Sequence, residues 1–234
     1  MDRKSQWNEA LDEPTVQKWK DEEMEKTKNN LRRVISSRHG SPFVKTMLLA
    51  MQEAGCPIFH DVHIVIGECD PTSNVFGGFD QRNNRLILCQ NKFRLISSDR
   101  EKLTSMESLL SHELIHAYDY CRANVDFYNN PKHVMCSEIR AASLSGECMF
   151  KRKRNRAIFN GMRGYHKLCV KKAAMASFMS LHQSWTNEEA EQLMTQLFPS
   201  CYSDDEPFDR KPLTKDDAKL SYKAFITRNR YIIS

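Results

Sequence analysis

The feature that most constrains the fold of this chain is the pattern His112-Glu113-Leu114-Ile115-His116, which lies in a segment of helical periodicity. Residues four apart on a helix project from one face, so the rings of His112 and His116 can bind one metal ion. Glu113 lies one position around the helix, where it can reach water rather than the metal itself. This pattern is typical of a catalytic zinc helix in which the glutamate is the general base.

The residues around this pattern predict the start of a helix and its buried side. Thr104 and Glu107 form a capping box, which predicts that the helix begins one or two turns before His112. An apolar stripe at helical spacing predicts the side that packs on a core: Leu110, Leu114, Ala117 and Cys121. The helix is therefore expected to have one buried face and one chemical face.

A catalytic zinc site needs a third protein ligand, because three ligands and water complete it. Glu138 is the favoured candidate, since it follows the turn Asn129-Asn130-Pro131, which lets a second helix pack back on the first. His133, Asp119 and Asp126 are the alternatives that the sequence leaves open. We therefore predict one Zn²⁺ per chain, bound by His112, His116 and Glu138.

The sequence predicts an α+β fold of the zincin-like kind. β-rich runs at Ile58–Ile66, Asn74–Phe79 and Arg85–Cys89 predict a small mixed or antiparallel sheet packed on the active-site helix. The pair Gly77-Gly78 predicts a close backbone approach or a bulge on an edge strand, and such an edge can bind an extended peptide. Further helices are expected at 41–55, 132–148, 166–183, 187–198 and 214–228, the fourth beginning at a second capping box formed by Thr186 and Glu189.

Length and composition predict one domain. The chain has 234 residues, 40% of them hydrophobic and 28% charged, which is usual for a globular protein with a real core. Residues 1–40 are strongly charged and are predicted to form a helical extension, followed by a single domain at 41–234. No apolar run approaches the roughly 18 residues that span a bilayer. The start of the chain resembles neither a secretory signal nor a mitochondrial presequence, so these signals alone predict a cytosolic protein.

The charge and the cysteines leave alternatives open. A net charge of +5 permits an acidic or anionic partner without demonstrating one. The basic cluster Lys151–Arg156 contains no aromatic residue, so a solvated face or a patch for an anionic membrane is favoured over nucleic-acid binding. The eight cysteines include no C-x-x-C pair, and they can form four disulfides or remain eight buried thiols.

Two blocks of sequence carry a resemblance to a known family. His112–Arg122 and Cys136–Cys148, with the separation between them, resemble the mitochondrial inner-membrane zinc metalloproteases that process and assemble ATP synthase. The resemblance extends from about Cys56 to Pro207 and is weakest over residues 1–40. One departure concerns the residue four positions after the glutamate ligand: many zincins have an aspartate there that supports a histidine, whereas this chain has Ala142. Asp119 is therefore the better candidate for that role.

The resemblance implies a location and a substrate. Members of the family lie in the intermembrane space, are attached peripherally to the inner membrane, and mature the precursor of ATP synthase subunit six. They enter through a disulfide relay, which implies that the eight cysteines are mostly oxidised and explains the missing presequence. Family members also assist assembly of the ATP synthase membrane sector.

Two other functions remain as alternatives. The first is an assembly chaperone that does not depend on proteolysis, a role described as separable within the family. The second is a nuclear, DNA-repair-associated (Ku-binding) metalloprotease, which only the basic cluster supports. For the zincin mechanism the sequence does not assign the group that stabilises the oxyanion beside zinc; Tyr165, His166 and His133 are the candidates.

Overall fold

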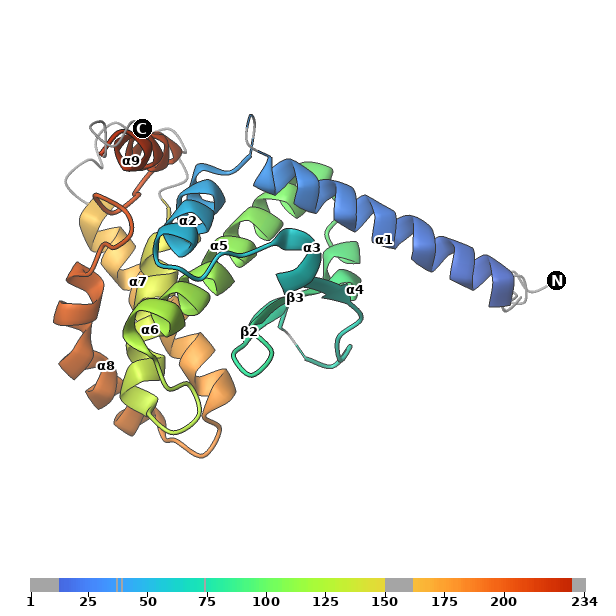
Figure 1. Cartoon of the computed structure of the whole chain (residues 1–234). Coiled ribbons are helices and arrows are strands. Elements are labelled where there is room, and N and C mark those ends of the chain that lie inside the picture. Colours follow the sequence, from blue (N-terminus) through green and yellow to red (C-terminus); the bar gives the residue numbers. More distant parts are fainter. Residues whose placement is uncertain (1–12, 37, 39, 74, 150–161, 229–234) are drawn as a thin grey trace.

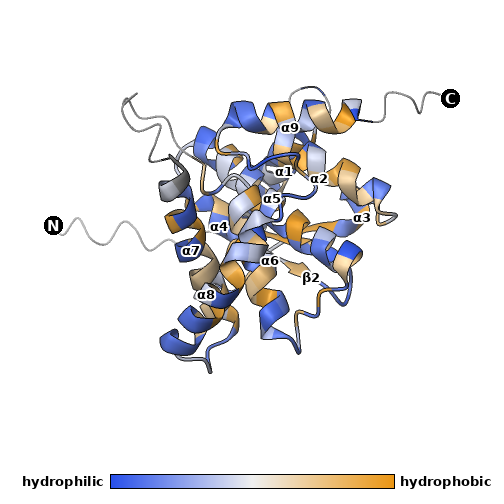
Figure 2. Cartoon of the chain, turned by 90° about the vertical axis from the view of Figure 1, so that its left-hand side faces the viewer, coloured by the Kyte–Doolittle hydropathy of each residue, from blue (hydrophilic) through white to orange (hydrophobic). Residues whose placement is uncertain are grey.

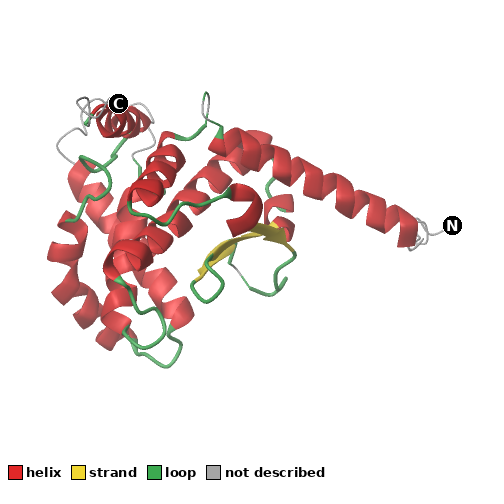
Figure 3. Cartoon of the chain, viewed as in Figure 1, coloured by secondary structure: helices red, strands yellow, loops and turns green. Residues whose placement is uncertain are grey.

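The computed structural model describes residues 13–36, 38, 40–73, 75–149 and 162–228. These residues form nine helices beside one small sheet, so the predicted α+β class is confirmed (Figure 3). The helices are α1 (Glu13–Ile35), α2 (Pro42–Glu53), α3 (His60–His63), α4 (Gln90–Arg94), α5 (Asp99–Ala123), α6 (Pro131–Leu144), α7 (Met162–Leu181), α8 (Asn187–Ser203) and α9 (Lys215–Thr227). The strands are β1 (Ile64–Gly67), β2 (Gly77–Asp80) and β3 (Arg85–Cys89).

The sheet is mixed and has the strand order β1-β3-β2, which leaves β2 at one edge as predicted. β1 runs parallel to β3, and β2 runs antiparallel to it, with Gly78 opposite Ile87. The predicted close approach is also confirmed, because the α-carbon of Gly77 lies against the backbone carbonyl of Ile87 and leaves no room for a side chain. Of the predicted run Ile58–Ile66, only the last three residues are in a strand, because His60–His63 form α3.

The central helix α5 begins earlier than the capping-box pattern predicts. Ser98 is its N-cap, and Thr104 lies inside the helix, where its hydroxyl donates to the carbonyl of Arg100 at 3.0 Å. The predicted start near Thr104 is therefore wrong. The helix ends at Asn124, whose φ of 50° lies in the left-handed region that asparagine tolerates. The capping box of Thr186 and α8, by contrast, is confirmed.

Two hydrophobic cores meet at α5 and α6. The first core is formed by α2, α5, the sheet and parts of α1 and α9, with Phe43, Met47 and Leu114 fully buried in it. The second is formed by α6, α7 and α8 around Phe178. Figure 1 shows α5 running through the middle of the body with the sheet beside it, as predicted, and α6 packs against α5. The side of α8 that faces away from the body is largely hydrophilic (Figure 2), as expected for a helix with one buried face.

The first helix divides into two parts along its length. Its N-terminal end projects away from the body (Figure 1), whereas Leu31 and Val34 near its other end are buried in the first core. The division into an extension at 1–40 and a domain at 41–234 stays a prediction. The basic cluster Lys151–Arg156 lies outside the described residues. Among the residues described, no helix is long and apolar enough to cross a membrane.

All eight cysteines are paired in disulfides, as the resemblance implies. Two bridges close long loops: Cys56–Cys121 joins the segment after α2 to the end of α5, and Cys136–Cys201 joins α6 to α8. The other two, Cys69–Cys89 and Cys148–Cys169, close loops of 20 and 21 residues. Two bridges therefore join α7 and α8 to α6 and the segment after it, one joins α5 to the segment after α2, and one joins the end of β3 to the segment after β1.

Candidate metal centre

The two histidines of α5 and one carboxylate of α6 converge. The rings of His112 and His116 lie one helical turn apart, with centroids separated by 4.8 Å. Glu138 lies opposite them: its Oε2 is 3.3 Å from Nε2 of His112, and its Oε1 is 3.6 Å from Nε2 of His116. One ligand atom from each of the three residues lies within 4.8 Å of the other two. The sequence-predicted ligand set is therefore brought together in space.

The surroundings of Glu138 fit a metal ion. Its carboxylate is almost completely buried, and no donor among the described residues is aligned to form a hydrogen bond with Oε2, although His112 is near. A buried carboxylate oxygen without a donor is costly, and a cation between it and the two rings removes that cost. Two imidazoles and a carboxylate are also the ligand set that zinc uses in catalytic sites.

The charges at the centre are strongly coupled. Burial raises the pKa of Glu138, but the two facing histidines outweigh it and hold that pKa below its usual value. Burial lowers the pKa of His116 to about 4, so this ring is neutral at pH 7. For His112, the carboxylates of Glu147 and Glu138 outweigh the effect of burial and raise the pKa. The arrangement of these residues thus favours a positive charge between the carboxylates.

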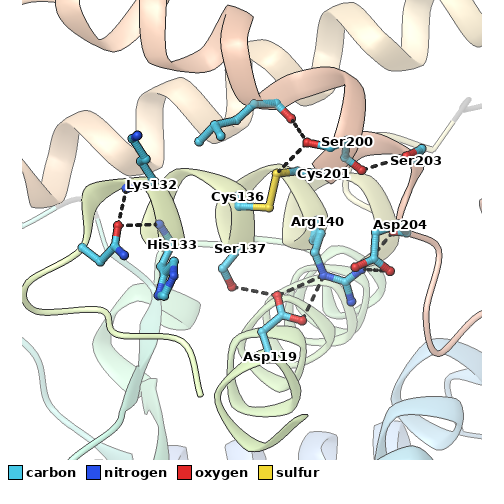
Figure 4. The surroundings of a disulfide bond; sticks show 12 residues. Asp119, Lys132, His133, Cys136, Ser137, Arg140, Ser200, Cys201, Ser203 and Asp204 are labelled. Atoms are coloured by element: carbon cyan, nitrogen blue, oxygen red, sulfur yellow. Dashed lines mark hydrogen bonds and ion pairs between the residues drawn. A yellow bond between two sulfur atoms is a disulfide. The ribbon is translucent and has the colours of Figure 1, made fainter. Parts of the chain in front are cut away.

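Hydrogen bonds behind His116 fix which of its nitrogens faces the centre. The hydroxyl of Ser137 donates to Oδ2 of Asp119 at 3.0 Å, so its oxygen can only accept from Nδ1 of His116, 2.8 Å away. The proton therefore lies on Nδ1, and the lone pair of Nε2 points toward Glu138. Figure 4 shows Ser137 and Arg140 of α6 both pointing to Asp119.

Asp119 is itself held by a buried ion pair. The Nε of Arg140 donates to its two carboxylate oxygens at 2.9 and 3.1 Å. The same guanidinium donates to the backbone carbonyls of Asp204 and Glu206, which lie in the acidic loop Ser203–Pro207 at the end of α8. Asp119 therefore contacts His116 only indirectly, through Ser137. The acidic loop in turn holds Arg140, which pairs with Asp119.

Glu113 lies beside the edge of the sheet. Its carboxylate is buried, and the backbone amide of Phe79 in β2 faces it. Burial raises its pKa to about 7, against the opposing effect of His112, while the negative charge of Glu138 adds to the rise. A carboxyl group with a pKa near neutrality can both accept and return a proton.

Two further candidates for metal binding lie elsewhere. Nδ1 of His133 accepts a hydrogen bond from the backbone N–H of Asp126, and the Asp126 carboxylate accepts from the following turn.

Among the oxyanion candidates, His166 is buried between α6 and α8, with Nδ1 2.8 Å from the hydroxyl of Tyr202. Tyr165 is half exposed on α7.

One residue at the centre was not found from the sequence. Oε2 of Glu147 lies 3.6 Å from Nδ1 of His112, in the position of a carboxylate that orients a ligand ring. Glu147 follows Gly146, whose φ of 89° turns the chain back after α6. No periodicity marks such a loop residue, so only the folded chain reveals its place.

Comparisons with known proteins identify the family. The model of the peptidase M76 family matches residues 25–209, most of the chain. The chain belongs to the peptidase M76 family. It is therefore a metallopeptidase, as the motif predicts.

Curated relatives carry consistent names. A Xenopus laevis protein named mitochondrial inner membrane protease ATP23 homolog is 41% identical over 191 residues, covering 82% of this chain and 77% of the relative. The Homo sapiens protein of that name is 36% identical over 199 residues, covering 85% and 76%. A fungal relative from Mycosarcoma maydis, named mitochondrial inner membrane protease ATP23, is 37% identical over 154 residues, covering 62% and 66%. No solved structure matches the chain significantly.

Proposed function

We propose that this chain is a zinc metalloendopeptidase whose metal ligands are His112, His116 and Glu138 and whose general base is Glu113. The observation that carries the proposal is the convergence of the three ligand atoms beside a buried carboxylate oxygen that lacks a donor. A zinc ion bound there supplies Lewis-acid chemistry, because it polarises a carbonyl group and makes water more acidic.

The reaction is hydrolysis of a peptide bond, and Glu113 moves the proton. Its carboxylate accepts a proton from the attacking water, whose oxygen forms a bond to the scissile carbonyl carbon. When the carbon–nitrogen bond breaks, Glu113 returns the proton to the leaving amine.

The substrate peptide binds extended along the open edge of β2. Cys89 N donates to the carbonyl of Phe76 at 2.9 Å, which makes these two residues a hydrogen-bonded pair of the antiparallel strands. Because such pairs alternate, Gly78 bonds to β3, whereas Gly77 and Phe79 direct their backbone groups to the open edge. The amide of Phe79 is directed to Glu113, and the remaining backbone groups of this edge can pair with an added strand beside it.

An aromatic wall borders this edge and the metal centre. The ring of Phe127 packs edge-on against His116, with centroids 5.5 Å apart, and against Phe79, at 6.2 Å. Phe79 also contacts Tyr120 at 6.0 Å. A substrate with an apolar side chain near the cleaved bond fits such a wall.

The proposed cellular role draws on the names of the relatives and on the disulfides. Their printed names support the proposal that this chain acts at the mitochondrial inner membrane. Four disulfides favour an oxidising compartment, so we place it on the intermembrane-space side, attached peripherally. Its proposed substrate is the precursor of ATP synthase subunit six, and it assists assembly of the membrane sector. Nucleic acid is not expected as a partner.

Zinc stoichiometry tests the metal centre. Purified, oxidised wild-type chain is expected to hold one zinc ion, and Glu138→Gln to lose most of it, because a neutral amide replaces the anionic ligand. His133→Gln, a change of similar size on the same helix, is the matched control and should keep its zinc. Retention of full zinc affinity by Glu138→Gln would reject Glu138 as a ligand.

Cleavage and assembly are separated by Glu113→Gln. This variant should keep its zinc and its fold yet lose cleavage of the subunit precursor by at least about a hundredfold, the contribution usual for a general base. Assembly of the membrane sector, followed in mitochondria that contain only this variant, distinguishes the two roles. Normal assembly without cleavage supports a separate chaperone function, whereas undiminished cleavage contradicts the proposed enzyme.

A further inference from the structure

The segment that leads into β2 is tied to the start of α4 by side chains. We call residues 68–73 the leader; it contains no helix or strand. Asn91 bonds both backbone groups of Cys69: its Nδ2 donates to the carbonyl at 2.9 Å, and its Oδ1 accepts from the N–H at 3.0 Å. An amide that satisfies both groups of one residue fixes that residue in place as a strand partner does.

Lys92 holds the leader two residues further on. Its side chain is buried, 5% exposed, and its Nζ donates to the backbone carbonyls of Pro71, at 3.0 Å, and Ser73. Within the described chain, no carboxylate lies within ion-pair distance of this ammonium. Burial of a charged ammonium is costly unless its hydrogens are bonded. The contacts to the leader carbonyls therefore account for a lysine where an apolar side chain would pack at lower cost.

Two more links close the arrangement. The disulfide Cys69–Cys89 joins the leader to the end of β3, and Arg94 forms an ion pair with Glu68 at 3.0 Å. Four residues between 89 and 94 thus hold six residues of an otherwise irregular segment. The leader itself contains no residue of the metal centre.

The leader determines where the edge of β2 lies. Only a few residues separate Ser73 from Phe79, whose backbone amide faces Glu113. Phe76 lies between them, and its ring packs edge-on against Phe93 of α4, with centroids 5.8 Å apart. A shift of the leader is therefore transmitted along β2 to the groups proposed to pair with a peptide. The metal ligands lie on α5 and α6, and the groups that orient His112 and His116 are Glu147 and Ser137, neither of which belongs to β2 or the leader.

We propose that Asn91 and Lys92 are positioning residues that hold the open edge of β2 in place for an extended substrate. The inference rests on the proposed function, since it concerns how that active site binds its peptide. Neither residue contacts the metal ligands or the general base. Their loss weakens substrate binding and leaves the chemical step in place.

Steady-state kinetics of Lys92→Met test the inference. Met keeps the unbranched stem and removes the ammonium. The probe is a quenched fluorescent peptide, selected from random decapeptides by cleavage with the wild type. We expect KM to rise about tenfold, kcat to change less than twofold and zinc to remain at one per chain. Asn91→Ala, which loses both bonds to Cys69, should raise KM similarly.

Lys211→Met is the matched control. The side chain of Lys211 is also largely buried, but its ammonium pairs with Asp205 in the acidic loop. That loop is far from β2 in the sequence. This variant should keep the wild-type KM. Hydrogen exchange provides a second readout: the backbone amides of residues 75–80 should exchange faster in Lys92→Met, while those of α5 and α6 are unchanged.

The outcomes separate this inference from the proposed function. A wild-type chain without zinc, or one whose cleavage survives Glu113→Gln, overturns the proposed function itself. A zinc-loaded, active wild type with an unchanged KM in Lys92→Met and Asn91→Ala overturns only the positioning role. A fall in kcat or zinc content with unchanged KM also contradicts it, because the residues would then act on the metal centre or on general stability.

Discussion

At the scale of the residue, the metal centre depends on groups that contact a ligand residue on the side facing away from the centre. Ser137 has one proton and donates it to Asp119, which leaves its oxygen to accept from His116. The ring is thereby held in the tautomer that presents Nε2 to the centre. Partners of this kind commonly contribute ten- to a hundredfold to metal affinity.

Ser137→Ala should therefore weaken zinc binding by about tenfold or more without unfolding the protein. Competition with a fluorescent chelator of known affinity measures the loss. Ser143→Ala is the matched control: it makes the same change on the same helix, and the buried Ser143 hydroxyl has no hydrogen-bond partner among the described residues. Equal zinc affinities of the two variants would show that the serine does not orient the ring.

His166 is the residue through which acid should weaken the packing of α6, α7 and α8. Burial first, and then the charge of Lys211, lower its pKa from 6.5 to about 4. Between pH 6.5 and pH 4, His166 is protonated in the unfolded chain but stays neutral in the folded chain. The neutral, buried ring therefore contributes its full stabilisation, on the order of 2 to 3 kcal/mol, above about pH 6.5. This stabilisation is lost as the pH falls toward 4.

The test compares wild type with His166→Gln, which can keep a bond to the hydroxyl of Tyr202. Urea unfolding at about pH 7 and about pH 4.5 gives the free energy of unfolding of each. The wild type should lose more stability than the variant on acidification, so the difference between them narrows or reverses. Parallel losses in both proteins would assign the acid sensitivity to other groups.

At the scale of the element, the edge strand β2 depends on one glycine and not on its neighbour. A side chain at Gly77 would collide with the backbone carbonyl of Ile87 and lie 3.0 Å from a methyl group of Leu109, whereas Gly78 faces open space. Gly77→Ala should cost about 1 to 3 kcal/mol of unfolding free energy, the usual range for overpacking, and slow peptide cleavage. Gly78→Ala should cost little. Urea unfolding compares them, and equal losses would contradict the close approach.

Much of the element order was predictable because local signals and the fold agree. Thr186 begins α8 as its capping box predicts, and the Gly77-Gly78 pair marks an edge strand. The equivalent pattern at Thr104 failed, because Ser98 caps a longer helix and Glu107 instead pairs with Lys215 of α9, 108 residues away. A contact so distant in sequence leaves no periodic trace near Thr104.

The candidate site also contains some residues that could be predicted from the sequence and others that could not. His112, Glu113 and His116 follow from spacing on one helix, and Glu138 from a turn that folds a second helix back. Glu147 does not, because its place depends on how the loop after α6 turns at Gly146. The link from Asp119 through Ser137 was missed for a similar reason: a serine in a helix has many possible partners, and only packing selects one.

At the scale of the whole molecule, disulfides should decide whether the chain folds. Chain entropy predicts that each bridge over 65 residues contributes about 4 kcal/mol, and each over 20 or 21 residues about 3 kcal/mol. The sum is comparable to the total stability of a typical domain, about 5 to 15 kcal/mol. The reduced chain is therefore expected to be largely unfolded and unable to assemble the zinc ligands, which come from two helices.

The bridges should also differ in what their loss does. Paired serine substitutions at Cys136 and Cys201, which release α6 from α8, should lower the unfolding free energy more than the same change at Cys69 and Cys89. The second pair should retain zinc but raise KM, because it frees only the segment that leads into β2. Urea unfolding, zinc content and peptide kinetics on the two variants separate these effects. If the order of stability is reversed, loop length does not govern the contribution of the bridges, and native packing around the shorter loop must outweigh chain entropy.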